Sequence, residues 1–69
     1  MQIKLYEARK RAKLSQQEVA DILGISRNSY GQKERGYVPF NLEEMFALSE
    51  LLDSSLDDLF ISKKKEVEL

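Results

Sequence analysis

The most restrictive feature of this 69-residue sequence is a three-residue connection, Gly24-Ile25-Ser26, between two short segments of helical pattern. Ser15 and Glu18 have the spacing of a capping box, in which each side chain satisfies an N–H group at the start of a helix. Apolar residues then form one stripe, and Gly24 stands where a left-handed backbone ends a helix without steric penalty. The sequence therefore predicts a first short helix of about eight residues that stops at Gly24.

The segment after this connection has the pattern of a second short helix. Ser26 is a good N-cap, Ile25 and Tyr30 have the spacing of a hydrophobic staple, and Gly36 ends the helix. So short a connection leaves too few residues for antiparallel packing, and the two helices must cross steeply. Ala20 in the first helix is small enough for a close crossing. These features together predict a helix-turn-helix.

Apolar residues at helical spacing predict three further helices. One spans about residues 3–12, and another carries the apolar stripe Leu42, Met45, Phe46, Leu48, Ser49 and Leu52. The helix that ends at Gly24 has its own apolar stripe, which consists of Val19, Ala20, Ile22 and Leu23. Residues 36–41 form a loop, and Ser55 caps a short last helix. We therefore expect an all-α, compact five-helix domain over residues 1–61 and a charged tail over residues 62–69.

The composition excludes several classes of function. A chain this short buries only a small core, so a deep substrate cavity is not expected. With no cysteine and no histidine, the chain lacks a thiolate nucleophile and the usual zinc and imidazole chemistry. It has no signal-peptide pattern and no run of about 20 apolar residues. We expect a cytoplasmic protein with no metal, cofactor, membrane segment or small-molecule substrate, and no enzyme activity.

The net charge of −1 hides an uneven distribution of charge along the chain. Residues 1–38 carry eight basic and four acidic side chains, which sum to +4. Residues 39–69 carry three basic and eight acidic side chains, which sum to −5. Such a separation fits a protein that presents one face to a polyanion while its other half stays away from it.

The second helix of the predicted helix-turn-helix has one face without apolar side chains. The residues on this face are Arg27, Asn28, Gly31, Gln32 and Arg35. A helix fits the major groove of DNA, where Arg pairs with guanine and Asn or Gln with adenine. Gly31 costs about 1 kcal/mol relative to Ala in a helix interior. It either leaves clearance for DNA or is a tolerated poor helix residue.

Four motifs in the sequence occur in order and at a spacing that is specific in combination. They are Leu14-Ser15-Gln16-Gln17-Glu18-Val19-Ala20, Leu23-Gly24-Ile25-Ser26, Glu34-Arg35-Gly36 and Ser55-Leu56-Asp57-Asp58-Leu59-Phe60. The chain thereby resembles the Cro and phage-repressor type, or XRE-type, helix-turn-helix regulators from Leu5 to Phe60. This resemblance implies a lambda-repressor-like DNA-binding domain that binds a palindromic operator as a homodimer.

The resemblance also implies roles for individual side chains. Those matching base-reading positions are Arg27, Asn28 and Gln32. Those matching or near phosphate-contacting positions are Ser15, Gln16, Arg35 and Tyr37. Arg9 and Glu34 correspond to a pair that forms a structural salt bridge between the helix over residues 3–12 and the helix that follows Ser26. Two positions depart from the family pattern, because Lys33 stands where an apolar residue is usual and Asp53-Ser54 replaces a glycine and an apolar residue.

Two functions fit these observations. The leading hypothesis is a sequence-specific double-stranded DNA-binding transcriptional regulator, a repressor of phage or mobile-element type, that binds a palindromic operator as a homodimer through the major groove. The expected dimer interface is then the short last helix with Phe60, Ile61 and the tail. The alternative is a protein-interaction module, such as an antitoxin-like or adaptor protein, whose acidic half binds a basic partner. Lys10, Arg11 and Lys13 are expected to form a solvated helix face. Lys63 to Lys65 are expected to keep the tail soluble, with nonspecific attraction to DNA as the alternative.

Overall fold

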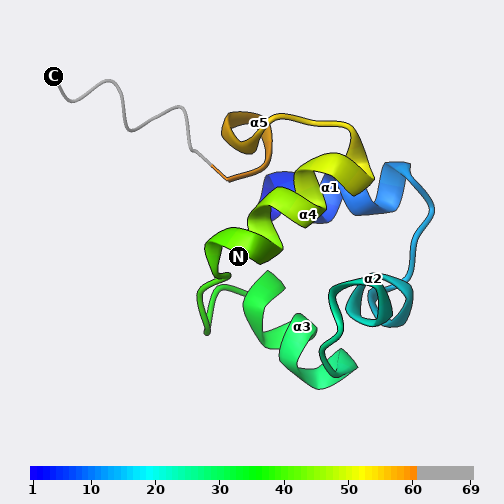
Figure 1. Ribbon diagram of the computed structural model, residues 1–69, viewed down its shortest axis with the longest axis vertical. Coiled ribbons are helices and arrows are strands. Elements are labelled where there is room, and N and C mark those ends of the chain that lie inside the picture. Colours follow the sequence, from blue (N-terminus) through cyan, green and yellow to red (C-terminus); the bar gives the residue numbers. More distant parts are fainter. Residues whose placement is uncertain (61–69) are drawn as a thin grey trace, which may run out of the picture.

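A computed structural model describes residues 1–60 of the chain (Figure 1). Within these residues the helices are α1 (Ile3–Arg11), α2 (Gln16–Leu23), α3 (Arg27–Glu34), α4 (Leu42–Leu52) and α5 (Leu56–Phe60). This part of the chain contains no strand. The predicted all-α, five-helix fold is confirmed. Ile61, the predicted tail over residues 62–69 and its cations Lys63 to Lys65 lie outside the described residues.

Side-chain caps fix where the short helices begin and end. Ser15 Oγ accepts the N–H of Glu18 at 3.0 Å, while the Glu18 carboxylate accepts the N–H of Ser15 at 2.8 Å. Gly24 ends α2 with a φ of +76°, in the left-handed region where a side chain would be strained. Ser26 caps α3 by accepting the N–H of Ser29 at 3.0 Å. The predicted capping box, helix end and N-cap are therefore confirmed.

Within residues 1–60, two residues other than glycine also have a positive φ, Lys13 at +60° and Asp53 at +50°. Asp53 ends α4 at the position where related sequences are expected to have glycine. A left-handed conformation costs most residues about 1–2 kcal/mol, and short polar residues such as Asp tolerate it better than Lys does. The presence of Asp53 in place of glycine, one of the two departures from the family pattern, therefore costs backbone energy at the end of α4.

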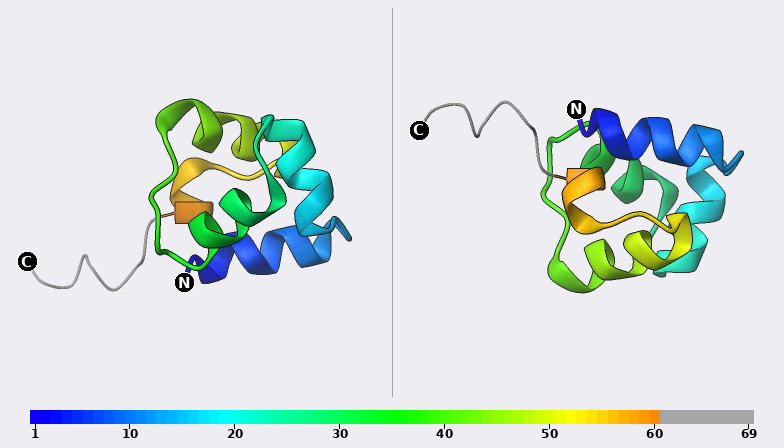
Figure 2. Two further views of the ribbon diagram at one scale, coloured as in Figure 1. Left: turned by 90° about the horizontal axis from the view of Figure 1, so that it is seen from below. Right: turned by 90° about the horizontal axis from the view of Figure 1, so that it is seen from above.

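The five helices enclose one hydrophobic core. Figure 2 shows α1 and α4 on opposite sides of the molecule, with α2 at one end and the loop after α3 at the other. The buried apolar residues are Leu5, Ala8, Val19, Ala20, Tyr30, Phe40, Leu48 and Leu59. Each helix contributes at least one of them, so the position of α3 is set by the packing of the whole domain.

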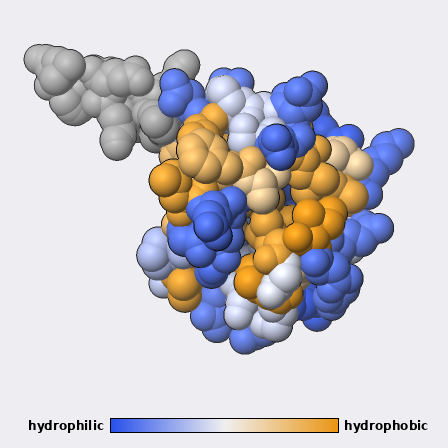
Figure 3. Space-filling model, in the orientation of Figure 1, coloured by the Kyte–Doolittle hydropathy of each residue, from blue (hydrophilic) through white to orange (hydrophobic). Residues whose placement is uncertain are grey.

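Three residues assigned to apolar stripes by the sequence are instead exposed, which corrects the predicted packing. Ile22 is 53% exposed, Leu42 57% and Phe46 53%. Phe40, from the predicted loop, is buried instead, and its ring lies 6.0 Å from that of Tyr30. A core this small covers only part of each helical stripe, so the remaining apolar residues face solvent. Figure 3 shows apolar surface on the side of the molecule where α4 lies.

Candidate nucleic-acid interface

The helix-turn-helix consists of α2, the turn at Gly24 to Ser26, and α3. Val19, Ala20 and Tyr30 are fully buried at the corner between the two helices, and Ile25 packs against them. Because Tyr30 points inward from the middle of α3, the opposite face of that helix is left for other contacts. Arg27 and Asn28 lie exposed on its first turn. The predicted outward face is confirmed for Arg27, Asn28 and Arg35, whereas Gly31 is buried and Gln32 is half-buried.

Glu34, at the end of α3, is the centre of a buried hydrogen-bond cluster. Its carboxylate accepts bonds from Arg9 Nε at 2.8 Å and Arg9 Nη2 at 3.1 Å. The hydroxyl of Tyr30 donates to it at 2.8 Å, and Gln16 Nε2 donates at 2.9 Å. The structure therefore brings together Arg9 and Glu34, the pair expected to form a salt bridge. It adds two bonds, from Tyr30 and Gln16, that sequence reasoning missed.

The hydrogen bonds in this cluster favour its charged state. Burial alone would raise the pKa of Glu34, but the bonds from Arg9, Gln16 and Tyr30 outweigh it and hold that pKa below its usual value. The pKa of Arg9 is raised, chiefly by its bond to Glu34. Burial and the bond to Glu34 raise the pKa of Tyr30. At neutral pH the end of α3 is thus tied to α1 by the ion pair with Arg9 and to α2 by the hydrogen bond from Gln16.

Lys33, the other departure from the family pattern, joins α3 to α4. Its ammonium group lies 2.7 and 2.8 Å from the two carboxylate oxygens of Glu44 and 6.0 Å from the centre of the Phe40 ring. Burial alone would raise the pKa of Glu44, but the hydrogen bonds from Lys33 and from the N–H of Asn41 outweigh it and hold that pKa below its usual value. A cation at this position therefore anchors α3 by an ion pair instead of by apolar contact.

The outward side of the helix-turn-helix contains a shallow hollow of about 150 Å³. The residues that line it are Gln16, Arg27, Asn28, Gly31 and Arg35. Two guanidinium groups and two amides thus surround one small space between α2 and α3. Gly31 lines the hollow and is buried, so it forms part of the floor. A Cβ atom added at Gly31 would lie 3.8 Å from Gln16 Oε1. The hollow is polar and positively charged, which suits a phosphate or a base edge of a nucleic acid.

Three of the expected contact residues do not line this hollow. Gln32 is half-buried, and its carbonyl accepts the N–H of Tyr37 at 2.9 Å. The Tyr37 side chain is 75% exposed in the loop after α3. Ser15 is exposed at the N-terminus of α2, where its hydroxyl oxygen serves as the cap.

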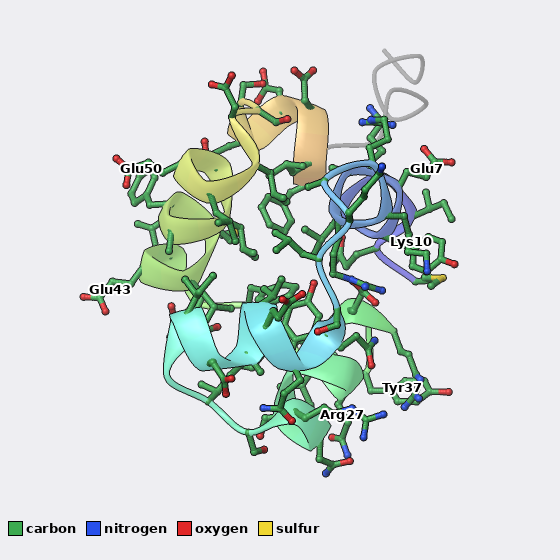
Figure 4. The ribbon with its side chains drawn as sticks, turned by 90° about the vertical axis from the view of Figure 1, so that its right-hand side faces the viewer. Glu7, Lys10, Arg27, Tyr37, Glu43 and Glu50 are labelled. Carbon is green, nitrogen blue, oxygen red and sulfur yellow. The ribbon has the colours of Figure 1, made fainter. Side chains whose placement is uncertain are left out.

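Charge is distributed unevenly over the folded molecule. Figure 4 shows Arg27 at one end of the molecule and Glu43 and Glu50 along a different side, on α4. In this view Tyr37 also lies on the side away from these two acids. The exposed acids Glu43 and Glu50 of α4 thus lie on a different side of the molecule from Arg27, at the start of α3.

Two classes of site are absent from the described part of the chain. Between residues 1 and 60 there is no group of three or more acidic, Cys or His side chains that could hold a metal ion. None of the helices in this range has the length and apolar character needed to span a bilayer.

Comparison with known proteins identifies the family. A family described as helix-turn-helix matches residues 5–59. The chain belongs to this helix-turn-helix family. The match confirms the resemblance to XRE-type regulators inferred from the four motifs, and with it the lambda-repressor-like fold. Members of this family are DNA-binding transcriptional regulators.

Two relatives of this helix-turn-helix chain come from Bacillus subtilis (strain 168). The HTH-type transcriptional regulator AnsR is 36% identical over 63 residues, which cover 91% of this chain and 54% of AnsR. The uncharacterized HTH-type transcriptional regulator YqaE is 39% identical over 62 residues, covering 90% of this chain and 53% of YqaE. The chain thus spans about half the length of these relatives. No solved structure gave a significant match.

Proposed function

We propose that this chain is a sequence-specific double-stranded DNA-binding regulator that reads its site in the major groove through α3. The observation that carries the proposal is the hollow between α2 and α3, where Arg27, Asn28 and Arg35 meet Gln16. Arg27, Asn28 and Gln32 read bases, and Ser15, Gln16, Arg35 and Tyr37 contact phosphates. Each bidentate base contact contributes about 1–3 kcal/mol of discrimination.

The rigidity of α3 supports this assignment. Tyr30 is fully buried behind the helix, and Glu34 and Lys33 attach its last turn to α1, α2 and α4. Base reading requires side chains held at fixed positions relative to the groove, because hydrogen bonds to base edges depend on distance and angle. A helix fixed on three sides meets that requirement with its polar face outward.

The proposed regulator binds a palindromic operator as a homodimer. One helix of eight residues offers few base contacts, and a two-fold axis doubles them, with half-sites about 34 Å apart. AnsR and YqaE are named as transcriptional regulators, and we extend that role to this chain as a repressor of phage or mobile-element type. It acts in the cytoplasm, without a cofactor and without enzyme activity.

A protein-interaction module is the second candidate function. Leu42 and Phe46 are more than half exposed on one face of α4, beside the acids Glu43 and Glu50. An exposed apolar pair with acidic neighbours suits a basic, amphipathic partner segment. In this case DNA binding would be secondary, as in an antitoxin-like or adaptor protein.

Selection of DNA from a random pool, followed by binding titration, tests the leading proposal. The expected result is a palindromic consensus whose affinity falls steeply with salt. Replacing Arg27, Asn28 and Gln32 with Ala should abolish the preference for the consensus, whereas Glu50→Ala, on α4, should leave it intact. A wild-type chain that enriches no sequence at any salt concentration would reject the proposal in favour of the interaction module.

A further inference from the structure

The exposed cations of α1 and the turn after it lie in two different surroundings. A hollow of about 400 Å³ is lined by Arg9, Lys10, Lys13, Leu14, Ser15 and Glu18. A second hollow of about 270 Å³, between α1 and α5, has Lys4, Glu7, Arg11 and Asp58 as its charged lining. The first hollow contains three cations and one acid, whereas the second contains two of each. The uncompensated positive charge is therefore at the first hollow.

The charge of this first hollow comes mainly from Lys10 and Lys13. The Arg9 guanidinium is paired with Glu34, and the Glu18 carboxylate already accepts the N–H of Ser15 at 2.8 Å. Lys10 and Lys13 are both exposed, and the Lys10 ammonium group lies 5.9 Å from the centre of the Tyr6 ring. Both lysines thus place a positive charge at the surface next to the N-terminus of α2.

The backbone at Lys13 is left-handed at the residue after the C-cap of α1. Its φ of +60° is in the left-handed region, which glycine adopts with far less strain than a long side chain. Asp53 has a similar φ, but a short polar residue tolerates this conformation more easily. The left-handed Lys13 follows the C-cap of α1, and its side chain lines the hollow beside Ser15.

The hollow beside Lys10 and Lys13 adjoins the hollow between α2 and α3, where the DNA contacts are proposed. Ser15 lines it, and the next residue, Gln16, lines the hollow beside Arg27. The N-terminus of α2, whose N–H groups favour phosphate, lies between the two hollows. Figure 4 shows Lys10 on the same side of the molecule as Tyr37, with Glu43 and Glu50 on the other side. The cations that line the two hollows thus lie on either side of the start of α2, where Glu18 is the acid that lines one of them.

We propose that the DNA footprint extends beyond the helix-turn-helix onto this surface, where Lys10 and Lys13 contact backbone phosphates that flank those bound at the N-terminus of α2. The inference rests on the proposed function, because it requires that α3 enters a groove. These contacts strengthen binding to any sequence and do not read bases. Arg11, in the charge-balanced second hollow, lies outside the footprint.

Salt titration of DNA binding tests this extension, with Lys10→Gln and Lys13→Gln as variants and Arg11→Gln as the control. Each lysine variant should reduce the slope of log K against log salt by about 0.9, the value for one phosphate contact. The loss of affinity should be equal for the selected consensus and for unrelated duplex DNA. Arg11→Gln removes the same charge from the same region and should leave the slope unchanged.

Lys13→Gly separates a structural role from a role in binding. It relieves the left-handed strain, so it should raise the midpoint of thermal unfolding while it reduces the salt slope as Lys13→Gln does. Slopes equal to that of the wild type in both lysine variants, or an equal reduction in Arg11→Gln, would overturn the extended footprint. Those outcomes leave the selection of a consensus untouched, so they are distinguishable from failure of the proposed function.

Discussion

Lys33 on α3 and Glu44 on α4 form an ion pair in which Nζ lies 2.7 Å from Oε2, with only 15% and 9% of the two side chains exposed. Glu44 also accepts the N–H of Asn41 at 3.0 Å, so the same carboxylate completes the capping box of α4. The attachment of α3 and the start of α4 therefore depend on one acid, Glu44. Removal of either partner leaves a largely buried charge without its partner.

Lys33→Ala should lower the free energy of unfolding by about 1–3 kcal/mol, because it strands the Glu44 carboxylate in a mostly buried position. Urea denaturation of Lys33→Ala, Glu44→Gln and the double variant measures the coupling between the two side chains. Glu43→Gln, at an exposed acid in the same turn of α4, is the control and should change stability little. A coupling indistinguishable from zero would mean that the pair does not hold α3.

Glu34→Ala should cost more, about 3–5 kcal/mol, because it leaves the buried Arg9 guanidinium unpaired and removes the acceptor for Tyr30 and Gln16. Thermal and urea denaturation measure this loss. Glu7→Ala, at an exposed acid of α1, should be close to neutral. A negligible change for Glu34→Ala would contradict the structural role of the cluster.

Acidification should destabilise the fold through the same two carboxylates. The pKa values of Glu34 and Glu44 lie below the ordinary value of 4.5 in the folded chain. The unfolded state therefore binds protons first, and the stabilisation present above pH 4.5 is lost as the pH falls below it towards the folded-state values. Unfolding midpoints measured from pH 6 to pH 2.5, about the range of these groups, should fall more steeply for wild type than for Glu34→Gln. Parallel curves for the two proteins would count against this linkage.

The parts of the fold that could be predicted from the sequence are those fixed by neighbouring residues. The capping box of Ser15 and Glu18 and the left-handed Gly24 depend on contacts within one or two turns, which spacing reveals. The steep crossing of α2 and α3 follows from the short connection between them. Interactions between neighbouring residues are thus enough to predict the helix-turn-helix from the sequence.

Contacts between distant segments could not be predicted in the same way. Phe40 is buried although it lies in a loop, and Phe46 is exposed although it continues an apolar stripe. The sequence does not say how much of each stripe a small core covers. The bond from Gln16 to Glu34 joins residues 18 positions apart, and that from Lys33 to Glu44 spans a loop. The expected pair of Arg9 and Glu34 came from the family resemblance and not from spacing.

Asp53→Gly should raise the free energy of unfolding by up to about 1 kcal/mol. Asp53 ends α4 with a φ of +50° and a ψ of +48°, which glycine adopts without a steric penalty. Thermal denaturation measures the gain, and Gly24→Ala is the opposite substitution, made at a left-handed glycine with nothing within 4 Å of an added Cβ. It should destabilise through backbone strain alone. A loss of stability in Asp53→Gly would show that the aspartate makes a compensating interaction.

Gly31→Ala distinguishes the two interpretations of a glycine in the middle of α3. An added Cβ would lie 3.8 Å from Gln16 Oε1, an ordinary van der Waals contact, so the fold has room for alanine. The better helix propensity of alanine should then stabilise the chain by about 0.5–1 kcal/mol. The methyl group also fills part of the floor of the hollow between α2 and α3, so affinity for the selected consensus should fall if a DNA group enters there. Higher thermal stability combined with weaker DNA binding would assign Gly31 to clearance for DNA. Higher stability with unchanged binding would instead make it a tolerated poor helix residue, and it would place the DNA away from the hollow.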